Sequence, residues 1–356
     1  MNILYGVPGE GMGHATRSKV VINHLLKTHN VQVVSSARAY HFLSEAFGSR
    51  VHEIKGLHFA YKDAKVSKMG TFMLNLKHAP ENLLHNFSQY LLINKSFKPD
   101  LVISDFESFS YFFAKAHKIP AISIDNMQVM NRCKLDVKIS GQEKDNFKLA
   151  KAIVKAKVPG CEQYFITSFF DAEIKKRDTL IVPPIIREAI LRATPSVGNH
   201  IVMYQTSSSF GEVKEVLKQL PQQTFYVYGM NKNEQDGNII FKPFSEQGFI
   251  DDLASAKAVI ANGGFSFMSE AVYLKKPIFS FPIAGQFEQW MNAAYINKLG
   301  FGRHFDTLNA DALKAFMFDL EVFQQNLSKY RQEENRSLFA QLDSWMLRFA
   351  SQHQIK

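Results

Sequence analysis

The sequence is poor in cysteine and has no long hydrophobic run. Cys133 and Cys161 are the only cysteines in 356 residues, too few for a disulfide framework or a structural zinc site. No stretch of about eighteen uninterrupted apolar residues occurs, so no transmembrane helix is predicted. The N-terminus, MNILYGVPGEGMGH, has neither the positive region nor the apolar core of a signal peptide. We therefore expect a cytoplasmic protein.

The chain has enough length for two domains, and its charge is unevenly placed. At 356 residues and 46% hydrophobic residues, two domains of similar size with real cores are expected. Residues 1–180 hold 25 Lys and Arg against 16 Asp and Glu, whereas residues 181–356 hold 17 of each. The basic half can attract phosphorylated acceptors, acidic glycans, anionic lipid surfaces or nucleic acid, or it can serve solubility alone.

Apolar strand patterns alternate with helical stretches in both halves. The predicted strands of the first half cover residues 2–6, 31–35, 100–104 and 121–124. Those of the second half cover residues 201–204, 224–228, 239–241, 258–261 and 277–281. Such alternation is typical of parallel, doubly wound α/β sheets. The sequence thus predicts two Rossmann-like domains.

The predicted domain boundaries follow from composition. We assign residues 1–182 to an N-terminal domain and residues 199–335 to a C-terminal domain. The segment 183–198 contains prolines and glycine and is predicted to be the linker. An amphipathic helical pattern covers 313–349, and its final part, 336–356, is expected to form a terminal helix that can cross back to the N-terminal domain.

The first glycine-rich turn follows the first strand and contains Gly9, Gly11, Gly13 and His14. Glycines allow close backbone approach, and the helix that follows offers free N–H groups to an anion. A dinucleotide fingerprint requires glycine where His14 stands, and a P-loop requires a lysine that is absent. His14 lies on the carboxyl side of a strand, where its imidazole can accept a proton from a hydroxyl group near neutral pH. A plain structural turn remains an alternative.

Two carboxylates follow the apolar run at 101–104. Asp105 and Glu107 are predicted at the carboxyl end of that strand. Either can orient His14 or bind a ligand, and either can belong to a solvated turn.

A second glycine-rich turn ends the strand at 258–261. Gly263 and Gly264 precede a helix with Ser266 near its start, which makes a second anion cradle suited to a diphosphate. Glu270 follows one helical turn later, within reach of ribose hydroxyls, or it simply complements the helix dipole.

A polar loop follows the strand at 277–281. It carries Gln286, Glu288 and Gln289, whose donors and acceptors can read sugar hydroxyls. The same residues can equally begin a solvated helix.

Four segments, GVPGEGMGHATRS, DLVISDFESFS, SIDNMQ and NGGFSFMSEAVYLKKPIFSFPIAGQFEQWMNA, carry a specific resemblance. Over roughly residues 1–335 the chain resembles bacterial and archaeal glycosyltransferases related to the peptidoglycan N-acetylglucosaminyltransferase of the cell envelope. The resemblance implies a GT-B fold, in which two Rossmann-like domains face a central cleft. It also implies inverting, metal-independent transfer from a nucleotide sugar, expected to be UDP-linked, without a cofactor. The implied acceptor is a glycan or lipid-linked hydroxyl group, bound by the N-terminal domain.

The resemblance also implies roles for individual residues. His14 matches the position of the family's usual catalytic base, and Asp105 or Glu107, from their place at a strand end, can support it. The acceptor-side loop comprises Gly9, Gly11, Gly13 and Arg17. The donor-binding residues are Thr206, Ser207, Ser208, Phe244, Gly263, Gly264, Phe265, Ser266, Glu270, Gln286, Glu288 and Gln289.

Three alternatives remain at this point. Asp105-Phe106-Glu107 is similar to the metal-binding D-x-D pattern of the other major glycosyltransferase class. A nucleotide-sugar 2-epimerase shares the implied fold and needs no acceptor. A non-enzymatic polyanion-binding protein would explain the basic half, although no nucleic-acid-binding motif is evident.

The segment 58–80 interleaves lysines with aromatic and aliphatic residues. This pattern favours contact with an anionic membrane surface on its cytoplasmic side, or a helix and loop that pack their apolar face inward.

Overall fold

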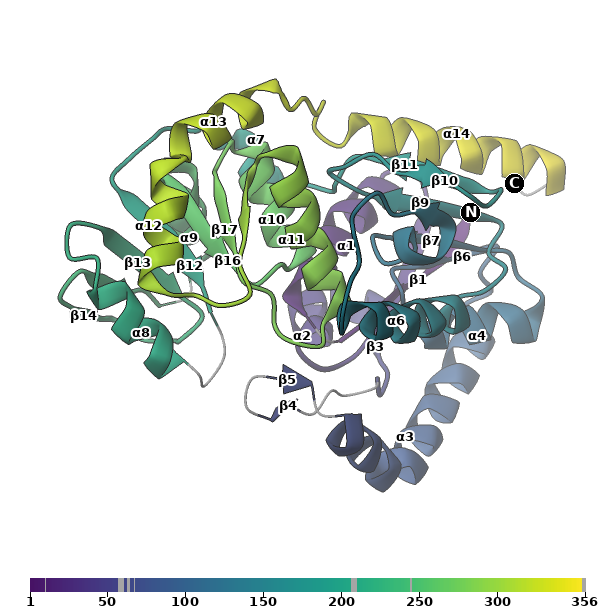
Figure 1. Ribbon diagram of the computed structural model, residues 1–356. Helices are drawn as coiled ribbons and strands as arrows, with labels where there is room; N and C mark the ends of the chain where they lie inside the picture. Colours follow the sequence, from purple (N-terminus) through teal and green to yellow (C-terminus); the bar gives the residue numbers. More distant parts are fainter. Residues whose placement is uncertain are drawn as a thin grey trace.

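The computed structural model describes residues 1–9, 11–56, 61–62, 65–66, 68–205, 210–243 and 245–353. They form two α/β lobes, each with a seven-stranded sheet (Figure 1). None of the helices in the described part of the chain is both long and apolar enough to cross a bilayer.

The N-terminal sheet is parallel throughout, with the strand order β11-β9-β7-β6-β1-β2-β3. Its strands are β1 (Asn2–Val7), β2 (Asn30–Ser35), β3 (Val51–Glu53), β6 (Leu101–Ser104), β7 (Ala121–Asp125), β9 (Gln163–Thr167) and β11 (Thr179–Val182). The chain leaves β1 toward β2 and β3 and later returns to its other side with β6. The crevice outside such a reversal is where open α/β sheets bind ligands.

Helices connect these strands, and two short antiparallel strand pairs lie outside the sheet. The helices are α1 (Met12–Leu25), α2 (Ala37–Phe47), α3 (Lys68–Ser96), α4 (Ser108–His117), α5 (Val129–Arg132) and α6 (Glu143–Lys157), with a 3-10 turn, η1 (Gly48–Arg50). The short antiparallel pairs are β4 (Tyr61–Lys62) with β5 (Lys65–Val66), and β8 (Cys133–Lys134) with β10 (Glu173–Ile174).

The C-terminal sheet has the order β14-β15-β13-β12-β16-β17-β18. Its strands are β12 (His200–Tyr204), β13 (Thr224–Tyr228), β14 (Glu234–Asp236), β15 (Ile239–Phe241), β16 (Ala258–Ala261), β17 (Ile278–Ser280) and β18 (Gly302–His304), of which only β14 is antiparallel to its neighbour. Its helices are α8 (Phe210–Lys218), α9 (Glu246–Ser255), α10 (Phe265–Tyr273), α11 (Phe287–Leu299), α12 (Ala310–Phe318) and α13 (Leu320–Lys329). Its order reverses between β12 and β16.

The terminal helix, α14 (Arg336–His353), packs on the N-terminal lobe rather than on the lobe that precedes it (Figure 1). Leu338, Leu342 and Met346 are buried in one core with Ile3 and other residues of the N-terminal sheet. The ring of His24 stacks on Phe339 with centroids 3.9 Å apart, and its Nε2 lies 2.8 Å from the carboxylate of Asp343.

Two stretches of chain therefore connect the lobes. The first is the segment after β11, which contains the short helix α7 (Glu188–Arg192), and the second precedes α14. The side-chain amide of Asn335 bonds both backbone groups of Ile186, at 2.9 and 2.8 Å. Gln332 donates to the carbonyl of Pro184 at 2.7 Å. The two connections thus lie side by side.

The helical pattern at 313–349 is broken in the structure. It is divided among α12, α13 and α14, because Asp319 leaves the helical region at the end of α12 and Tyr330 is extended after α13. Apolar residues continue through the first break, so periodicity alone did not reveal it, whereas the second break coincides with the polar residues 331–337.

Candidate active site

The two glycine-rich turns meet at the junction of the lobes. The hydroxyl of Ser266, in the first turn of α10, donates to the backbone carbonyl of Gly13, in the first turn of α1, at 3.1 Å. A Cβ atom at Gly13 would lie only 2.7 Å from that hydroxyl oxygen, so glycine permits this close approach. Gly9 and Gly11 lie in the same turn, between β1 and α1.

His14 and Asp105 face each other at the switch point of the N-terminal sheet. The Nδ1 atom of His14 lies 3.0 Å from Oδ1 of Asp105. His14 follows β1 and Asp105 follows β6, the neighbouring strand, so both side chains emerge at the carboxyl edge. Arg17 Nη2 lies 2.8 Å from the same Nδ1, so this nitrogen faces both an acceptor, Asp105, and a donor, Arg17. We take the tautomer with the proton on Nδ1, in which it donates to the carboxylate. Nε2 then has a free lone pair, on a side chain that is 20% exposed.

Arg17 and Ser18 complete the surroundings of Asp105. Arg17 Nε and the Ser18 hydroxyl each donate to Oδ2 at 2.9 Å, and Arg17 Nη2 donates to Oδ1. Burial alone would raise the pKa of Asp105, but the charge of Arg17 and the contact with His14 outweigh it and hold that pKa well below its ordinary value. Asp105 is therefore an anion near neutral pH.

Arg17 was predicted to lie in the acceptor-side loop, and the structure places it in α1, with its side chain buried. Its side chain is only 4% exposed and is engaged with Asp105 and Asn126. Its described contacts hold the dyad together instead of presenting a charge at the surface.

Glu107 serves the fold at a different point. Its carboxylate caps α4 by accepting from the backbone N–H groups of Phe109 at 2.6 Å and Ser110 at 2.7 Å. Burial raises the pKa of Glu107, partly offset by these two bonds. Of the two carboxylates, only Asp105 contacts His14. Because Asp105 and Glu107 have different partners, they do not converge as the D-x-D interpretation requires.

Asn126 links this cluster to the C-terminal lobe, and sequence reasoning missed it. Its Oδ1 accepts from Arg17 Nη1 at 2.7 Å, while its Nδ2 donates to Oε1 of Glu288 at 2.6 Å. The signal was available, because Asn126 directly follows β7 at the same carboxyl edge as Asp105.

The turn between β16 and α10 has the form of an anion cradle. Gly263 has φ +100°, and its carbonyl accepts from the buried amide of Asn292 at 2.9 Å. Gly264 is the N-cap of α10. Among the described residues, no side chain accepts from the first-turn N–H groups, and a Cβ at Gly264 would meet no atom within 4 Å. Open space beside unsatisfied N–H groups at a helix start favours a phosphate.

Phe265 was predicted to bind the donor, but its side chain holds the lobes together. It is buried, and its ring stacks on Phe169 of the N-terminal lobe with centroids 5.7 Å apart. The hydroxyl of Ser266 is likewise engaged by Gly13. What both residues offer a ligand is backbone N–H groups.

Glu270 is paired with an arginine from the linker. Arg187 donates to its two carboxylate oxygens at 2.6 and 2.7 Å, and also to Glu246 at 3.1 Å. Each oxygen keeps a second lone pair, so this bidentate pair orients the carboxylate without saturating it.

The polar loop before α11 is braced internally. Gln289 Oε1 accepts from the backbone N–H of Ile283 at 3.0 Å, and its Nε2 donates to Gln286 Oε1 at 2.6 Å. Glu288 and Gln289 lie in the first turn of α11, and Gln289 thus ties this turn to the loop that ends at Gln286. The predicted donor residues Thr206, Ser207, Ser208 and Phe244 lie outside the described residues, as do several positions of the segment 58–80.

Comparisons with known proteins agree with this arrangement. The family described as Glycosyl transferase family 1 matches residues 1–321. Two uncharacterised glycosyltransferases, from Methanosarcina mazei and Methanosarcina acetivorans, are 27% and 26% identical over 335 residues, covering 85% of this chain and 85% of each relative.

Solved structures show the same fold at low sequence identity. Phytolacca americana UGT2, complexed with UDP-2-fluoroglucose and pterostilbene, superimposes with a TM-score of 0.69 at 13% identity, over 97% of this chain and 98% of that one. The calicheamicin glycosyltransferase CalG4 gives a TM-score of 0.66 at 15% identity over 98% of each chain. With two parallel-sheet lobes, opposed glycine turns and a match over most of its length, the chain belongs to glycosyl transferase family 1 and is a glycosyltransferase of the GT-B fold.

Proposed function

We propose that the protein transfers a sugar, with inversion and without a metal ion, from a nucleotide-sugar donor to a hydroxyl acceptor. The observation that carries the proposal is the contact between His14 and Asp105 at the switch point. This contact leaves Nε2 of His14 free to act as a base at the junction of the lobes. The anion cradle at the start of α10 lies on the other side of this junction.

In this mechanism His14 is the general base. Asp105 holds the Nδ1–H and stabilises the imidazolium that forms when Nε2 takes the acceptor proton, an effect that typically contributes about 10²–10⁴-fold. The acceptor oxygen attacks the anomeric carbon from the face opposite the diphosphate. The bond from that carbon to the diphosphate breaks, and the leaving group takes the electron pair.

The C-terminal lobe stabilises the charge that develops on the diphosphate. The first-turn N–H groups of α10 beside Gly264 are oriented toward it before the reaction, and each well-placed donor is typically worth a few kcal/mol. Glu270, oriented by Arg187, accepts hydrogen bonds from the ribose. Gln286 and Glu288 read the sugar hydroxyls. A UDP donor is supported by the UDP sugar named in the UGT2 complex.

A lipid-linked acceptor, reached at the inner face of the cytoplasmic membrane, is supported by exposed apolar side chains on α3. We call this surface the α3 face; it consists of the exposed residues Leu84, Phe87, Leu91 and Leu92, which recur at helical spacing. Leu84 is 73% exposed and Phe87 is 58% exposed. The surface belongs to the half of the chain that carries the whole positive excess, which suits anionic lipid headgroups. The resemblance to peptidoglycan transferases points the same way.

A nucleotide titration followed by product analysis tests the proposal. We expect UDP to raise the melting temperature more than GDP, dTDP or CMP, because a ligand that binds only the native state stabilises it. Glu270→Gln should weaken this shift, whereas Arg187→Lys, which keeps the charge but not the fork, should weaken it less.

Transfer is then assayed with a UDP sugar and a polyprenyl-linked acceptor. An inverted anomeric product that is lost in His14→Ala supports the assignment. An epimerised sugar nucleotide formed without transfer would show the 2-epimerase activity instead, and a complete lack of nucleotide binding would leave polyanion binding as the better explanation.

A further inference from the structure

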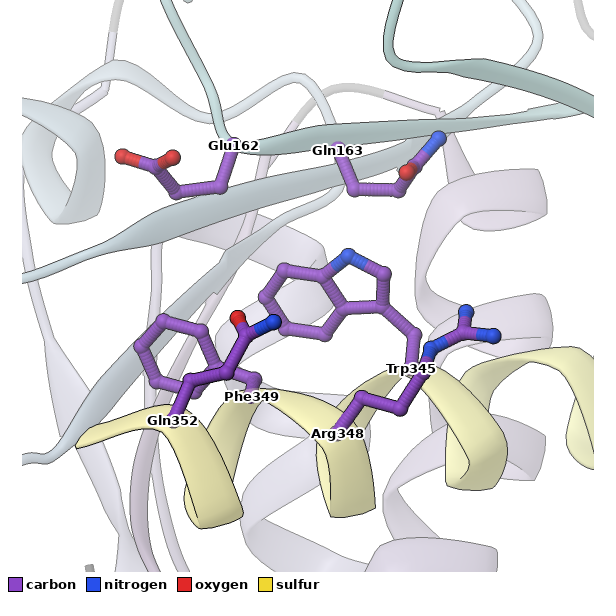
Figure 2. A pocket seen from close by; sticks show the side chains of 6 residues that line it. All are labelled: Glu162, Gln163, Trp345, Arg348, Phe349 and Gln352. Atoms are coloured by element: carbon purple, nitrogen blue, oxygen red, sulfur yellow. The ribbon is translucent and has the colours of Figure 1, made fainter. Parts of the chain in front are cut away.

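A cavity of about 340 Å³ lies between α14 and the first residues of β9 (Figure 2). It is lined by Glu162, Gln163, Trp345, Arg348, Phe349 and Gln352. Gln163 is the first residue of a parallel strand, so the cavity lies at the amino edge of the N-terminal sheet. His14 and Asp105 lie at the carboxyl edge, so the cavity is separate from the candidate active site.

The helix presents one face to this cavity. Trp345, Phe349 and Gln352 recur at helical spacing, and Figure 2 shows them rising from α14 toward the strand that carries Gln163. The ring of Phe349 is stacked on the indole of Trp345, with centroids 5.0 Å apart and planes 6° apart. The indole is therefore held in place as one wall.

The polar side chains around the indole are unengaged. Gln163 is only 9% exposed, yet its amide has no hydrogen-bond partner among the described residues, and it lies over the indole in Figure 2. Because this amide lines the cavity, its N–H and C=O groups are available to a ligand bound there. Within the same described part of the chain, Glu162, Arg348 and Gln352 also make no side-chain hydrogen bond or ion pair.

We propose that this cavity binds a neutral pyranose ring. Each sugar hydroxyl both donates and accepts, and the lining offers two amides, one carboxylate and one guanidinium to pair with them. The C–H face of the ring packs on the indole. Glu162 and Arg348 cancel in charge, so the lining does not select an anion such as a free phosphate. The volume is near the lower end of small-molecule sites and suits one or two sugar rings.

This second sugar site does not depend on the transfer reaction. Held at the edge of the sheet opposite His14, it would retain a glycan chain through a ring remote from the one that reacts, which raises the effective concentration of the chain near the enzyme.

Saturation-transfer NMR without nucleotide tests the site directly. The probes are the methyl glycosides of glucose, galactose and N-acetylglucosamine, with uridine as a flat aromatic comparison. We expect saturable transfer from at least one glycoside, with a dissociation constant on the order of a millimolar for so small a ligand. The intrinsic fluorescence should change in parallel, and this change should vanish in Trp345→Phe, which leaves Trp290 as the only tryptophan.

Matched variants assign the signal to the cavity. The double variant Arg348→Ala/Gln352→Ala changes two exposed residues and should weaken binding at least about fivefold, the loss expected for a hydrogen bond or more. Ser344→Ala, also exposed on α14 but outside the cavity, should bind as the native protein does. The proposal is overturned if no glycoside gives saturable transfer, if the double variant binds undiminished, or if uridine occupies the cavity and the sugars do not.

Discussion

The side-chain amide of Asn126 joins the two lobes, because its Nδ2 donates to Oε1 of Glu288 at 2.6 Å while its Oδ1 accepts from Arg17 at 2.7 Å. One end of the amide thus touches the cluster that orients His14, and the other touches the loop assigned to the donor sugar. The amide cannot be flipped, because its oxygen faces the cation of Arg17 and its NH2 group faces the carboxylate of Glu288.

Asn126→Asp is expected to weaken donor use. An aspartate cannot donate to Glu288 and would place two carboxylates against each other, so we expect kcat/KM for the donor to fall about 10–100-fold, mostly through KM. Steady-state kinetics with varied donor measure this. Asn233→Asp, on an exposed loop of the C-terminal lobe, introduces the same charge and should be neutral. Equal effects of the two changes would contradict the role of Asn126.

His14→Ala and Asp105→Asn should differ in their effect on stability. His14→Ala removes the base and should lower kcat about 10²–10⁴-fold, with little change in melting temperature because the side chain is partly exposed. Asp105→Asn leaves the buried Arg17 without its counter-ion, which typically costs about 3–5 kcal/mol in addition to the lost activity. Calorimetry beside the transfer assay separates the two effects. A destabilised His14→Ala protein that keeps its activity would refute the assignment.

The pH dependence of stability should report Asp105. Its pKa is lowered in the folded protein, so the stability that its ionised form contributes is complete above the unfolded value of about 3.9 and is lost as the pH falls through the lower folded pKa. We expect the difference in unfolding free energy between the native protein and Asp105→Asn to shrink as the pH falls below about 4, where the unfolded carboxylate takes up its proton first. Urea unfolding from about pH 5 to about pH 2 measures it, and a difference that does not shrink below about pH 4 would contradict the ion pair.

Alanine substitutions at the adjacent residues Gly263 and Gly264 should affect stability differently. At Gly263 the φ of +100° and a Cβ only 2.5 Å from the carbonyl oxygen of Gln289 should make alanine destabilising by more than about 1 kcal/mol. At Gly264 the φ of −63° and the open space predict a nearly unchanged melting temperature. The added methyl group there narrows the cradle, so UDP affinity should fall. Unchanged UDP affinity in a stable Gly264→Ala protein would argue against a phosphate at this turn.

The α3 face should bind anionic vesicles. We expect sedimentation with phosphatidylglycerol vesicles at low salt, weakened by added salt because exposed charges are screened. Leu84→Ser/Phe87→Ser should reduce binding severalfold without unfolding, since both side chains are mostly exposed. Val197→Ser, exposed on the linker, is the matched control. No sedimentation of the native protein at low salt would remove the membrane from the proposal.

The sequence was most informative where a feature is local. Alternating apolar runs predicted both sheets, and the rule that ligands gather at strand carboxyl ends selected His14 and Asp105 together. The sequence did not distinguish the role of Glu107 from that of Asp105. Glutamate is an uncommon N-cap residue, so its position at the start of a helix was not recognised.

Contacts between residues far apart in the sequence could not be predicted in this way. The pair of Glu270 with Arg187, the stack of Phe265 on Phe169, and the bond from Asn126 to Glu288 join residues 83 to 162 positions apart. The first depends on how the linker packs on the C-terminal lobe, and the other two depend on how one lobe is turned against the other, which no local periodicity specifies. Arg17 was assigned to the acceptor-side loop through the resemblance, and only the packing of β1, β6 and β7 shows that its side chain is enclosed.

The return of α14 to the N-terminal lobe has a consequence for synthesis on the ribosome. The core around Ile3 and Val31 includes Leu338 and Leu342, so the lobe that is translated first lacks one wall until α14 has emerged. The C-terminal lobe, whose strands and helices are contiguous from β12 to α13, can close first. During synthesis the first lobe to be made is therefore the last to be finished, and until then its open apolar wall is the part of the nascent chain that most needs a chaperone.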